Sequence, residues 1–124
     1  MKLAEIVFDC EHPARLARFW VAVLDGFEVR AYDEAEIARL AGLGLTPETD
    51  PVVMVDGPGL HLCFQKTDTR AGPKNKVHLD VSASDRPAEV DRVRALGATV
   101  VAELASSTWL HDPEGNDFCI TDPR

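Results

Sequence analysis

The stretch Asp112-Pro-Glu-Gly-Asn-Asp-Phe-Cys-Ile120 has an earlier counterpart in Asp56-Gly-Pro-Gly-Leu-His-Leu-Cys-Phe64. The two stretches align without gaps and share an aspartate, a glycine and a cysteine, with apolar residues on either side of each cysteine. A second match lies upstream of them, where Pro13-Ala14-Arg15-Leu16 corresponds to Pro87-Ala88-Glu89-Val90. Because both matches occur in the same order and with similar offsets, the sequence predicts two copies of one module.

Strand-like and helical hydrophobic periods alternate along the first half of the chain. Ile6, Val7 and Phe8 predict a first strand that is buried on both faces. Apolar residues at helical spacing follow, with Pro13 near the start and Gly26 just past the end, and they predict an amphipathic helix. The expected elements are a strand at 2–10, a helix at 12–24, a strand at 27–32, a short helix within 33–44, and a hairpin of strands at 51–55 and 60–65.

The second half repeats the order of the first. A stretch at about 67–76, with Gly72, Pro73 and three cations but no apolar period, predicts an exposed linker. A strand is then expected at 77–83, a helix at 86–96, and three short strands at 99–104, 107–111 and 117–121. The predicted fold class is α+β: two tandem βαβββ modules, about 1–70 and 77–124, form an open, curled mixed sheet with helices outside, in a single domain over 1–124.

Composition and charge narrow the classes of partner. Lys and Arg number 13 against 21 Asp and Glu, a net charge of -8, so nucleic acid and anionic membranes are not expected to bind. No basic region followed by an apolar run opens the sequence, and no stretch approaches the ~20 apolar residues of a membrane span, so a cytoplasmic location is expected. Three cysteines are an odd and sparse set, which favours reduced thiols over a disulfide framework.

Three motifs resemble signatures of one known group of proteins. Ala17-Arg18-Phe19-Trp20, with Val23-Leu24 and Gly26-Phe27 after it, resembles the helix-to-strand signature that opens a module of the glyoxalase/bleomycin-resistance, or vicinal oxygen chelate, superfamily. His78-Leu79-Asp80-Val81 resembles the start of the second module. The turn at 112–116 resembles the closing signature. The resemblance implies a cleft for a small organic molecule and a homodimer, but the superfamily spans several reactions and also metal-free binding proteins, so the fold alone selects no chemistry.

Strand alternation assigns a face to each residue near the predicted cleft. Side chains on a strand point alternately to opposite faces, so an apolar residue expected under a helix fixes the faces of its neighbours. On the four strands that matter, the residues expected to pack under the helices are Ile6, Phe8, Leu62, Phe64, Leu79, Val81, Phe118 and Ile120. The residues expected to face the cavity are Glu5, Val7, His61, Cys63, Gln65, His78, Asp80, Asp117 and Cys119.

The resemblance also implies positions for a metal. Metal-binding relatives take one ligand from the first and one from the last strand of each module, and the matching positions here are Glu5, Cys63, His78 and Cys119. Relatives usually have a carboxylate on both last strands, where this chain has cysteine. Two thiolates, an imidazole and a carboxylate suit a divalent zinc or iron ion better than magnesium or manganese. The alternative is that both cysteines are small buried hydrophobes and that no metal binds.

Five further residues are candidates for a ligand pocket. His61 and Gln65 flank Cys63 on its predicted face and would orient a polar ligand, unless His61 is structural. Trp109 precedes the 112–116 turn, where its indole either stacks on a flat ligand or fills the core. Asp80 and Asp117 face the cavity beside the candidate metal ligands. No catalytic residue is assigned: a nucleophilic Cys63 or Cys119 would need a nearby base, for which His78 or His61 is available, but no motif supports this chemistry.

Two functions therefore stay open. One is a metal-dependent lyase, isomerase or dioxygenase-type enzyme, in which the metal polarises substrate oxygens. The other is a metal-free protein of the bleomycin-resistance type that binds and sequesters a drug or metabolite. Both would act on a small organic molecule.

Overall fold

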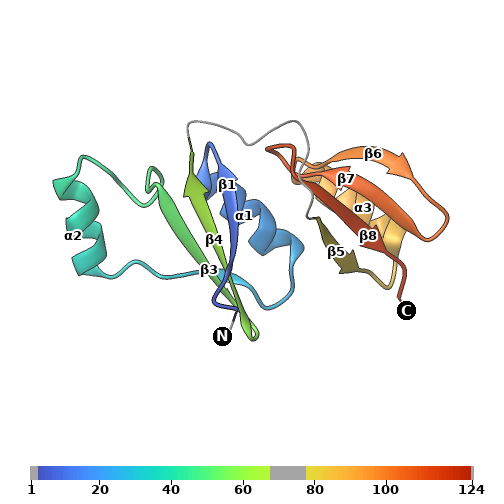
Figure 1. The fold of residues 1–124 in the computed structure, drawn as a ribbon, viewed down its shortest axis with the longest axis horizontal. Helices are drawn as coiled ribbons and strands as arrows, with labels where there is room; N and C mark the ends of the chain where they lie inside the picture. The colour runs from blue at the N-terminus through green and yellow to red at the C-terminus, as the bar shows by residue number, and fades with distance from the viewer. Residues whose placement is uncertain (1–2, 68–77, 124) are drawn as a thin grey trace. The chain divides into compact units, whose positions relative to one another are not determined.

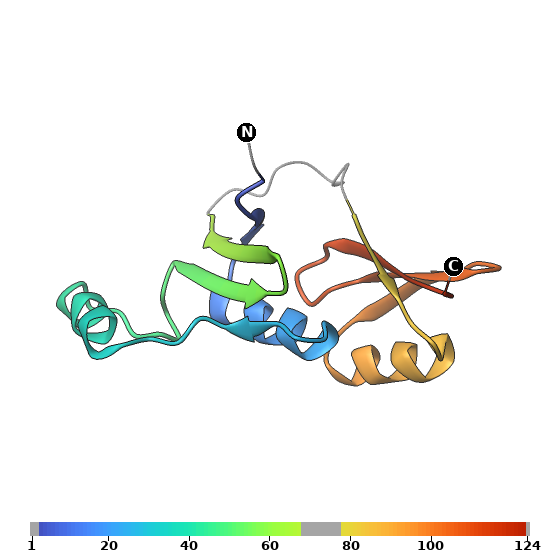
Figure 2. The same cartoon turned by 90° about the horizontal axis from the view of Figure 1, so that it is seen from below.

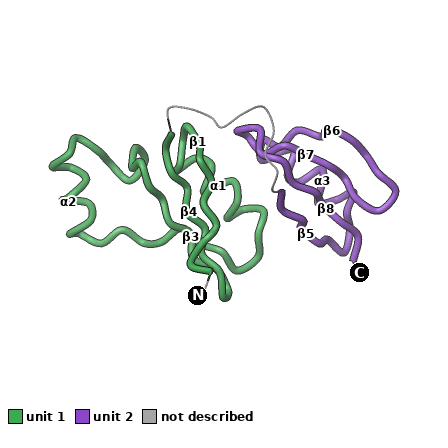
Figure 3. Tube along the Cα trace, in the orientation of Figure 1, with its two compact units in different colours: residues 1–70 green, residues 71–124 purple. Residues whose placement is uncertain are grey.

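The chain folds into two compact units. The structure is a computed structural model and describes residues 3–67 and 78–123. Unit 1 comprises residues 1–70 and unit 2 comprises residues 71–124, drawn in green and purple in Figure 3. The linker predicted at about 67–76 lies outside the described residues except for Thr67. Among the described residues, no helix is long and apolar enough to cross a membrane.

Unit 1 is a four-stranded mixed sheet with two helices (Figure 1). The strand order is β1-β4-β3-β2; β1 runs parallel to β4, and the other neighbours are antiparallel. The predicted short helix is present as α2, between β2 and β3. The elements are β1 (Ile6–Cys10), α1 (Pro13–Val23), β2 (Glu28–Val29), α2 (Glu34–Gly42), β3 (Val52–Gly57) and β4 (Leu60–Lys66).

Unit 2 repeats this topology, but its described residues, 78–123, contain no counterpart of α2. Its sheet has the order β5-β8-β7-β6, again with the first strand parallel to the last and the other pairs antiparallel. The elements are β5 (Leu79–Ser82), α3 (Arg86–Ala95), β6 (Thr99–Glu103), β7 (Ser107–His111) and β8 (Asp117–Thr121). The predicted α+β fold of two tandem βαβββ modules is confirmed, with a four-stranded mixed sheet in each.

One face of each sheet packs against a helix and forms the core. In unit 1, the Phe8 ring lies 5.0 Å from that of Phe64 and 5.5 Å from that of Trp20 on α1, centroid to centroid. In unit 2, α3 runs along one side of the strands, as Figure 2 shows, and buries Val90 and Val93. The residues that the two helices cover on their sheets include Val53, Val55, Leu62, Phe64, Leu110, Phe118 and Ile120, each at most 2% exposed.

Two predicted strands differ from the observed ones. Val7 is 47% exposed and Asp9 is exposed, so the prediction that β1 is buried on both faces is wrong. The reason is that α1 covers only one face of this sheet, which makes β1 a half-buried strand. The strand predicted at 27–32 is reduced to Glu28–Val29, with one further backbone hydrogen bond of 2.9 Å from Arg30 N to the Met54 oxygen.

The two matched turns differ by one residue. Asp56 pairs with His61 across the β3–β4 hairpin, whereas the residue that pairs with Asp117 across the β7–β8 turn is His111, not Asp112. The ungapped sequence match therefore aligns Asp56 with Asp112, whereas the strand pairing makes His111 the structural equivalent of Asp56, one residue earlier. Asp112 is 3% exposed, and its carboxylate accepts hydrogen bonds from the backbone N–H groups of Glu114 and Asn116 and from the Asn116 amide.

The 112–116 turn has one residue with a positive φ, Gly115, at 83°. Asparagine tolerates a positive φ better than most residues, but no non-glycine residue among those described has one, so Asn116 does not use this property. Asn116 instead stabilises the turn through its side-chain hydrogen bond of 2.8 Å to Asp112.

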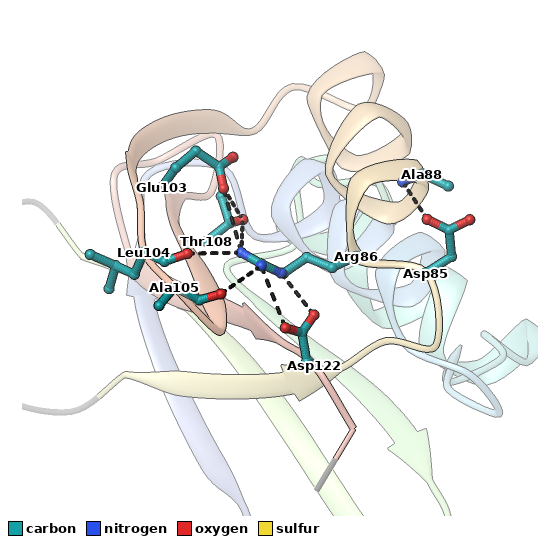
Figure 4. A network of polar contacts seen from close by, with 8 residues as sticks. All are labelled: Asp85, Arg86, Ala88, Glu103, Leu104, Ala105, Thr108 and Asp122. Atoms are coloured by element: carbon teal, nitrogen blue, oxygen red, sulfur yellow. Dashed lines mark hydrogen bonds and ion pairs between the residues drawn. The ribbon is translucent and has the colours of Figure 1, made fainter.

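Arg86, at the start of α3, ties the helix to the end of the chain (Figure 4). Its guanidinium donates to Asp122, with Nε 2.9 Å from Oδ1, and to the Thr108 hydroxyl at 3.2 Å. It also donates to the backbone oxygens of Leu104 and Ala105. Because the Arg86 side chain is only 16% exposed, these contacts hold α3, the β6–β7 connection and the chain after β8 together.

Candidate functional site

Each sheet has a second face, turned away from its helix, which we call the open face. Leu110, Phe118 and Ile120 are buried on the helix side of unit 2, so strand alternation places the residues between them on the open face. On this open face lie His78 and Asp80 from the β5 segment, Cys119 and Asp117 from β8, and Trp109 and His111 from β7.

Three of these residues form a group with the donor atoms of a metal site. Asp80 pairs with Cys119 across the parallel β5–β8 ladder, and His78 Nε2 lies 3.2 Å from Asp80 Oδ1. One ligand atom from each of His78, Asp80 and Cys119 lies within 4.8 Å of the other two. Ligands around a tetrahedral zinc ion are separated by about 3.5 Å, so the three donors would have to move closer together to share one ion.

The donor set fits a transition metal. A thiolate, an imidazole and a carboxylate together favour zinc or iron over the oxygen-seeking magnesium ion. His78 and Asp80 are exposed and Cys119 is half-buried, so an ion and a small ligand can reach the group from solvent. His78 and Cys119 are ligands implied by the resemblance, while Asp80 was expected to line a pocket rather than to ligate.

A second group lies beside the first on the same open face. Asp117 Oδ1 accepts a hydrogen bond of 2.7 Å from the Trp109 indole and lies 2.9 Å from His111 Nε2. The Asp117 side chain is 12% exposed, and the Trp109 and His111 rings meet edge to face at 6.1 Å. Trp109 is half-buried and faces away from α3, so it does not belong to the core under that helix.

The open face of unit 1 carries a different cluster. Asp56 receives two hydrogen bonds from the Arg30 guanidinium, at 2.7 and 3.1 Å, and lies 2.8 Å from His61 Nδ1. The hydrogen bonds from Arg30 lower the pKa of the Asp56 carboxyl below its usual value. His61, a predicted pocket residue, is thereby part of an ion-paired group and is half exposed.

The cysteines of the two open faces, Cys63 and Cys119, both have thiols with a raised pKa. Burial raises the pKa of the Cys63 thiol, and the charges of Glu5 and Asp9 raise it further. Burial, then Asp80 and Asp117, raise the pKa of the Cys119 thiol in the same way. A thiol with a raised pKa is a poor nucleophile at neutral pH, which argues against cysteine-based covalent chemistry. A cation that binds Cys119 must displace this proton.

The remaining predicted residues lie in unit 1. Glu5 immediately precedes β1, where its charge acts on the thiol of Cys63, and Cys63 pairs with Val7 of β1. Gln65 is exposed at the end of β4. The structure thus brings Glu5 near Cys63 in one unit and His78 near Cys119 in the other. That the two pairs meet at one metal stays a prediction.

Sequence reasoning missed His111 and Arg30. His111 follows Trp109 by two positions on β7, so alternation alone places the two on one face. The signal for His111 was therefore present in the sequence. Arg30 lies past the end of β2, and its bond to Asp56 depends on the pairing of β2 with β3, which the sequence pattern does not specify.

Solved structures of several proteins have the same fold at low sequence identity. An enzyme of the glyoxalase/bleomycin resistance protein/dioxygenase family from Burkholderia phytofirmans PsJN is 17% identical with a TM-score of 0.69, and the match covers 98% of each chain. A mutant of the fosfomycin resistance protein FosX from Listeria monocytogenes, complexed with Mn(II) and 1S,2S-dihydroxypropylphosphonic acid, is 13% identical with a TM-score of 0.67, over 98% of this chain and 89% of that one.

A third similar structure is the hypothetical protein SA1046 from S. aureus, 14% identical with a TM-score of 0.68, over 99% of this chain and 95% of that one. No protein of curated function matches the chain. The sequence model of the glyoxalase-like domain matches residues 5–121, which is almost the entire chain. The chain therefore belongs to the glyoxalase-like domain family of the vicinal oxygen chelate superfamily.

Proposed function

We propose that this protein is a metal-dependent enzyme that acts on a small organic molecule at the open face of unit 2. The observation that supports this best is the group of His78, Asp80 and Cys119, whose ligand atoms lie within 4.8 Å of one another. The reaction class is that of a lyase, isomerase or dioxygenase. Further parts of the proposal are that Glu5 and Cys63 complete the site, that the protein is a homodimer, and that it is cytoplasmic.

The residues of the open face of unit 2 have two roles in this proposal, metal binding and contact with the organic molecule. A divalent metal held by His78, Asp80 and Cys119 supplies Lewis-acid polarisation of substrate oxygens when it is bound. Trp109 offers a rigid, flat surface for an apolar or unsaturated part of the molecule. The Listeria FosX mutant, with Mn(II) and a dihydroxypropylphosphonic acid bound, is an example of this fold holding a metal and a small oxygen-rich ligand together.

A metal-free binding protein is the second candidate. The raised pKa values of the Cys63 and Cys119 thiols favour it, because a protonated thiol is a poor metal ligand. In this case the half-buried Trp109 and the polar groups around it would hold a drug or metabolite without reacting with it.

Metal analysis separates the two candidates. The protein would be purified without chelator under reducing conditions, its metal content measured by elemental analysis, and zinc binding to metal-stripped protein followed by titration calorimetry. The enzyme proposal predicts one zinc or iron ion per chain and proton release on binding, since Cys119 must lose its proton. Protein that contains no metal and binds none in the titration would refute it and leave the metal-free binder.

Two matched variants locate the site. Cys119→Ser should weaken zinc binding by at least about tenfold, because a hydroxyl is a much poorer zinc ligand than a thiolate. Cys63→Ser makes the same change at the equivalent position of the other module. If Cys63→Ser weakens binding as much, Cys63 belongs to the same metal site; if only Cys119→Ser does, the site is built by unit 2 alone. If neither does, the proposed site is wrong.

A further inference from the structure

A histidine and a carboxylate face each other at equivalent places in the two modules. Asp56 on β3 pairs with His61 on β4, and His111 on β7 pairs with Asp117 on β8. Each pair is also in side-chain contact, at 2.8 and 2.9 Å, and each belongs to the open face of its unit. The histidine and the acid have exchanged strands between the modules.

The partners of the two carboxylates make the pairs chemically different. Asp56 is neutralised by the Arg30 guanidinium, and half of the His61 side chain is exposed. Asp117 instead accepts from Trp109, whose indole N–H is neutral, and its side chain is only 12% exposed. The indole thus holds the Asp117 carboxylate in place beside His111, so the His111 ring has a fixed orientation on the open face.

The contact also sets which ring nitrogen of His111 carries hydrogen. An ionised carboxylate accepts hydrogen bonds only, so Nε2, which lies 2.9 Å from Asp117, must be the protonated nitrogen. The lone pair of a neutral His111 is then on Nδ1. In the first module Nδ1 faces Asp56, so His61 must have the opposite tautomer.

We propose that His111 is the residue that exchanges a proton with the molecule bound at the open face of unit 2, with Asp117 and Trp109 as its positioning residues. The inference rests on the proposed function. The Nδ1 lone pair takes a proton from an acidified C–H bond of the bound molecule, whose electron pair moves onto the adjacent carbonyl oxygen. The imidazolium keeps its Nε2–H bond to Asp117 and returns the proton from Nδ1.

The tautomer is tested first, and it requires no ligand. Long-range proton–nitrogen NMR spectra of the wild-type protein should show His111 protonated at Nε2 and His61 protonated at Nδ1. In Asp117→Asn the amide can donate to Nε2, so His111 should change to the Nδ1-protonated form. A wild-type His111 that is protonated at Nδ1 would overturn the inference.

Proton exchange is tested with hydroxyacetone, whose adjacent oxygens can chelate a metal and whose hydroxymethyl hydrogens are acidified by the carbonyl group. Zinc-loaded protein in deuterated water should catalyse exchange of these hydrogens, followed by proton NMR. His111→Asn and His111→Gln should each slow the exchange by at least about 100-fold. The matched control is His12→Asn, since His12 is exposed at the N-cap of α1 and asparagine is a favourable cap there.

The zinc content of every variant is measured, because it distinguishes a failure of the proposed function from a failure of the role proposed for His111. If the wild-type protein binds no zinc, the proposed function is refuted and the role of His111 falls with it. If zinc is bound but the wild-type protein leaves hydroxyacetone unexchanged, or His111→Asn exchanges it at the wild-type rate, only the role of His111 is refuted.

Discussion

Asp80 on β5 is the direct neighbour of Cys119 on β8 in the parallel ladder of unit 2. Residues opposite each other on one sheet face have side chains about 5 Å apart, which puts a carboxylate beside the thiol without any loop having to fold over it. Its charge is one cause of the raised pKa of Cys119. The same carboxylate that hinders ionisation of the thiol is positioned to share a cation with it.

Removal of this carboxylate should weaken metal binding. We expect Asp80→Asn to lower the zinc affinity by at least about tenfold, since a neutral amide is a weaker ligand for zinc than a carboxylate. The measurement is titration calorimetry with metal-stripped, reduced protein. Asp85→Asn is the control: it makes the same charge change at the N-cap of α3, where asparagine also caps well. Equal affinities of the two variants would exclude Asp80 as a ligand.

The Cys63 thiol should make stability depend on pH in the alkaline range. Burial and the nearby acids raise its pKa in the folded protein above the unfolded value of about 8.5. Between the two values the folded chain binds more protons than the unfolded chain, so the free energy of unfolding falls as the pH rises. Urea unfolding under reducing conditions at about pH 7.5 and 9.5 should show a smaller fall for Cys63→Ala than for the wild type. An equal fall in both proteins would exclude this origin.

The Arg86 contacts should be important for the stability of unit 2. Arg86→Ala leaves the buried Thr108 and the partly covered Asp122 without their shared donor, and we expect a loss of about 2–4 kcal/mol. Arg92→Ala on the same helix removes an exposed pair with Glu89 and should cost less than about 0.5 kcal/mol. Hydrogen exchange of peptides from residues 79–121 measures both losses. Similar protection in the two variants would contradict the importance of Arg86.

Two glycines in unit 1 should respond to alanine with opposite signs. A Cβ on Gly57 would collide with the Phe27 ring, so Gly57→Ala must displace that ring and should destabilise the protein by about 1–3 kcal/mol. A Cβ on Gly42, at the end of α2, meets nothing within 4 Å, and Gly42→Ala should stabilise by about 0.5–1 kcal/mol. Thermal unfolding followed by circular dichroism compares them. Equal unfolding temperatures for Gly57→Ala and Gly42→Ala would show that the Phe27 ring moves aside without a loss of stability.

The sequence was informative about the fold because its two modules repeat local patterns. Alternation alone locates β7 at Ser107–His111 and β8 at Asp117–Thr121, with the bounds that the structure has. It overestimated β1 burial because apolar composition at Ile6–Phe8 does not tell whether one face or two are covered. It also misaligned Asp56 with Asp112, since a shared residue type in two turns does not reveal a one-residue difference in length.

The candidate site was harder to predict than the fold. His78 and Cys119 are ligand candidates through the resemblance, and Asp80 was predicted as a pocket residue on the strand face that it has in the structure. The proposal that Asp80 is also a ligand depends on the β5–β8 register, which pairs it with Cys119 and which no local pattern encodes. His111 was missed although its face follows from Trp109, because the predicted faces covered only the first and last strands of each module and His111 lies on β7.

The zinc absorption-edge spectrum of two serine variants is the most direct measurement of whether unit 2 holds the metal through Cys119. In zinc-loaded Cys63→Ser, we expect a sulfur neighbour of zinc at about 2.3 Å together with nitrogen and oxygen ligands. In Cys119→Ser the sulfur contribution should fall, to none if unit 2 alone holds the metal and to that of Cys63 if Cys63 completes the site. A sulfur contribution that is undiminished in Cys119→Ser, or is missing from Cys63→Ser, would contradict a metal site built by His78, Asp80 and Cys119.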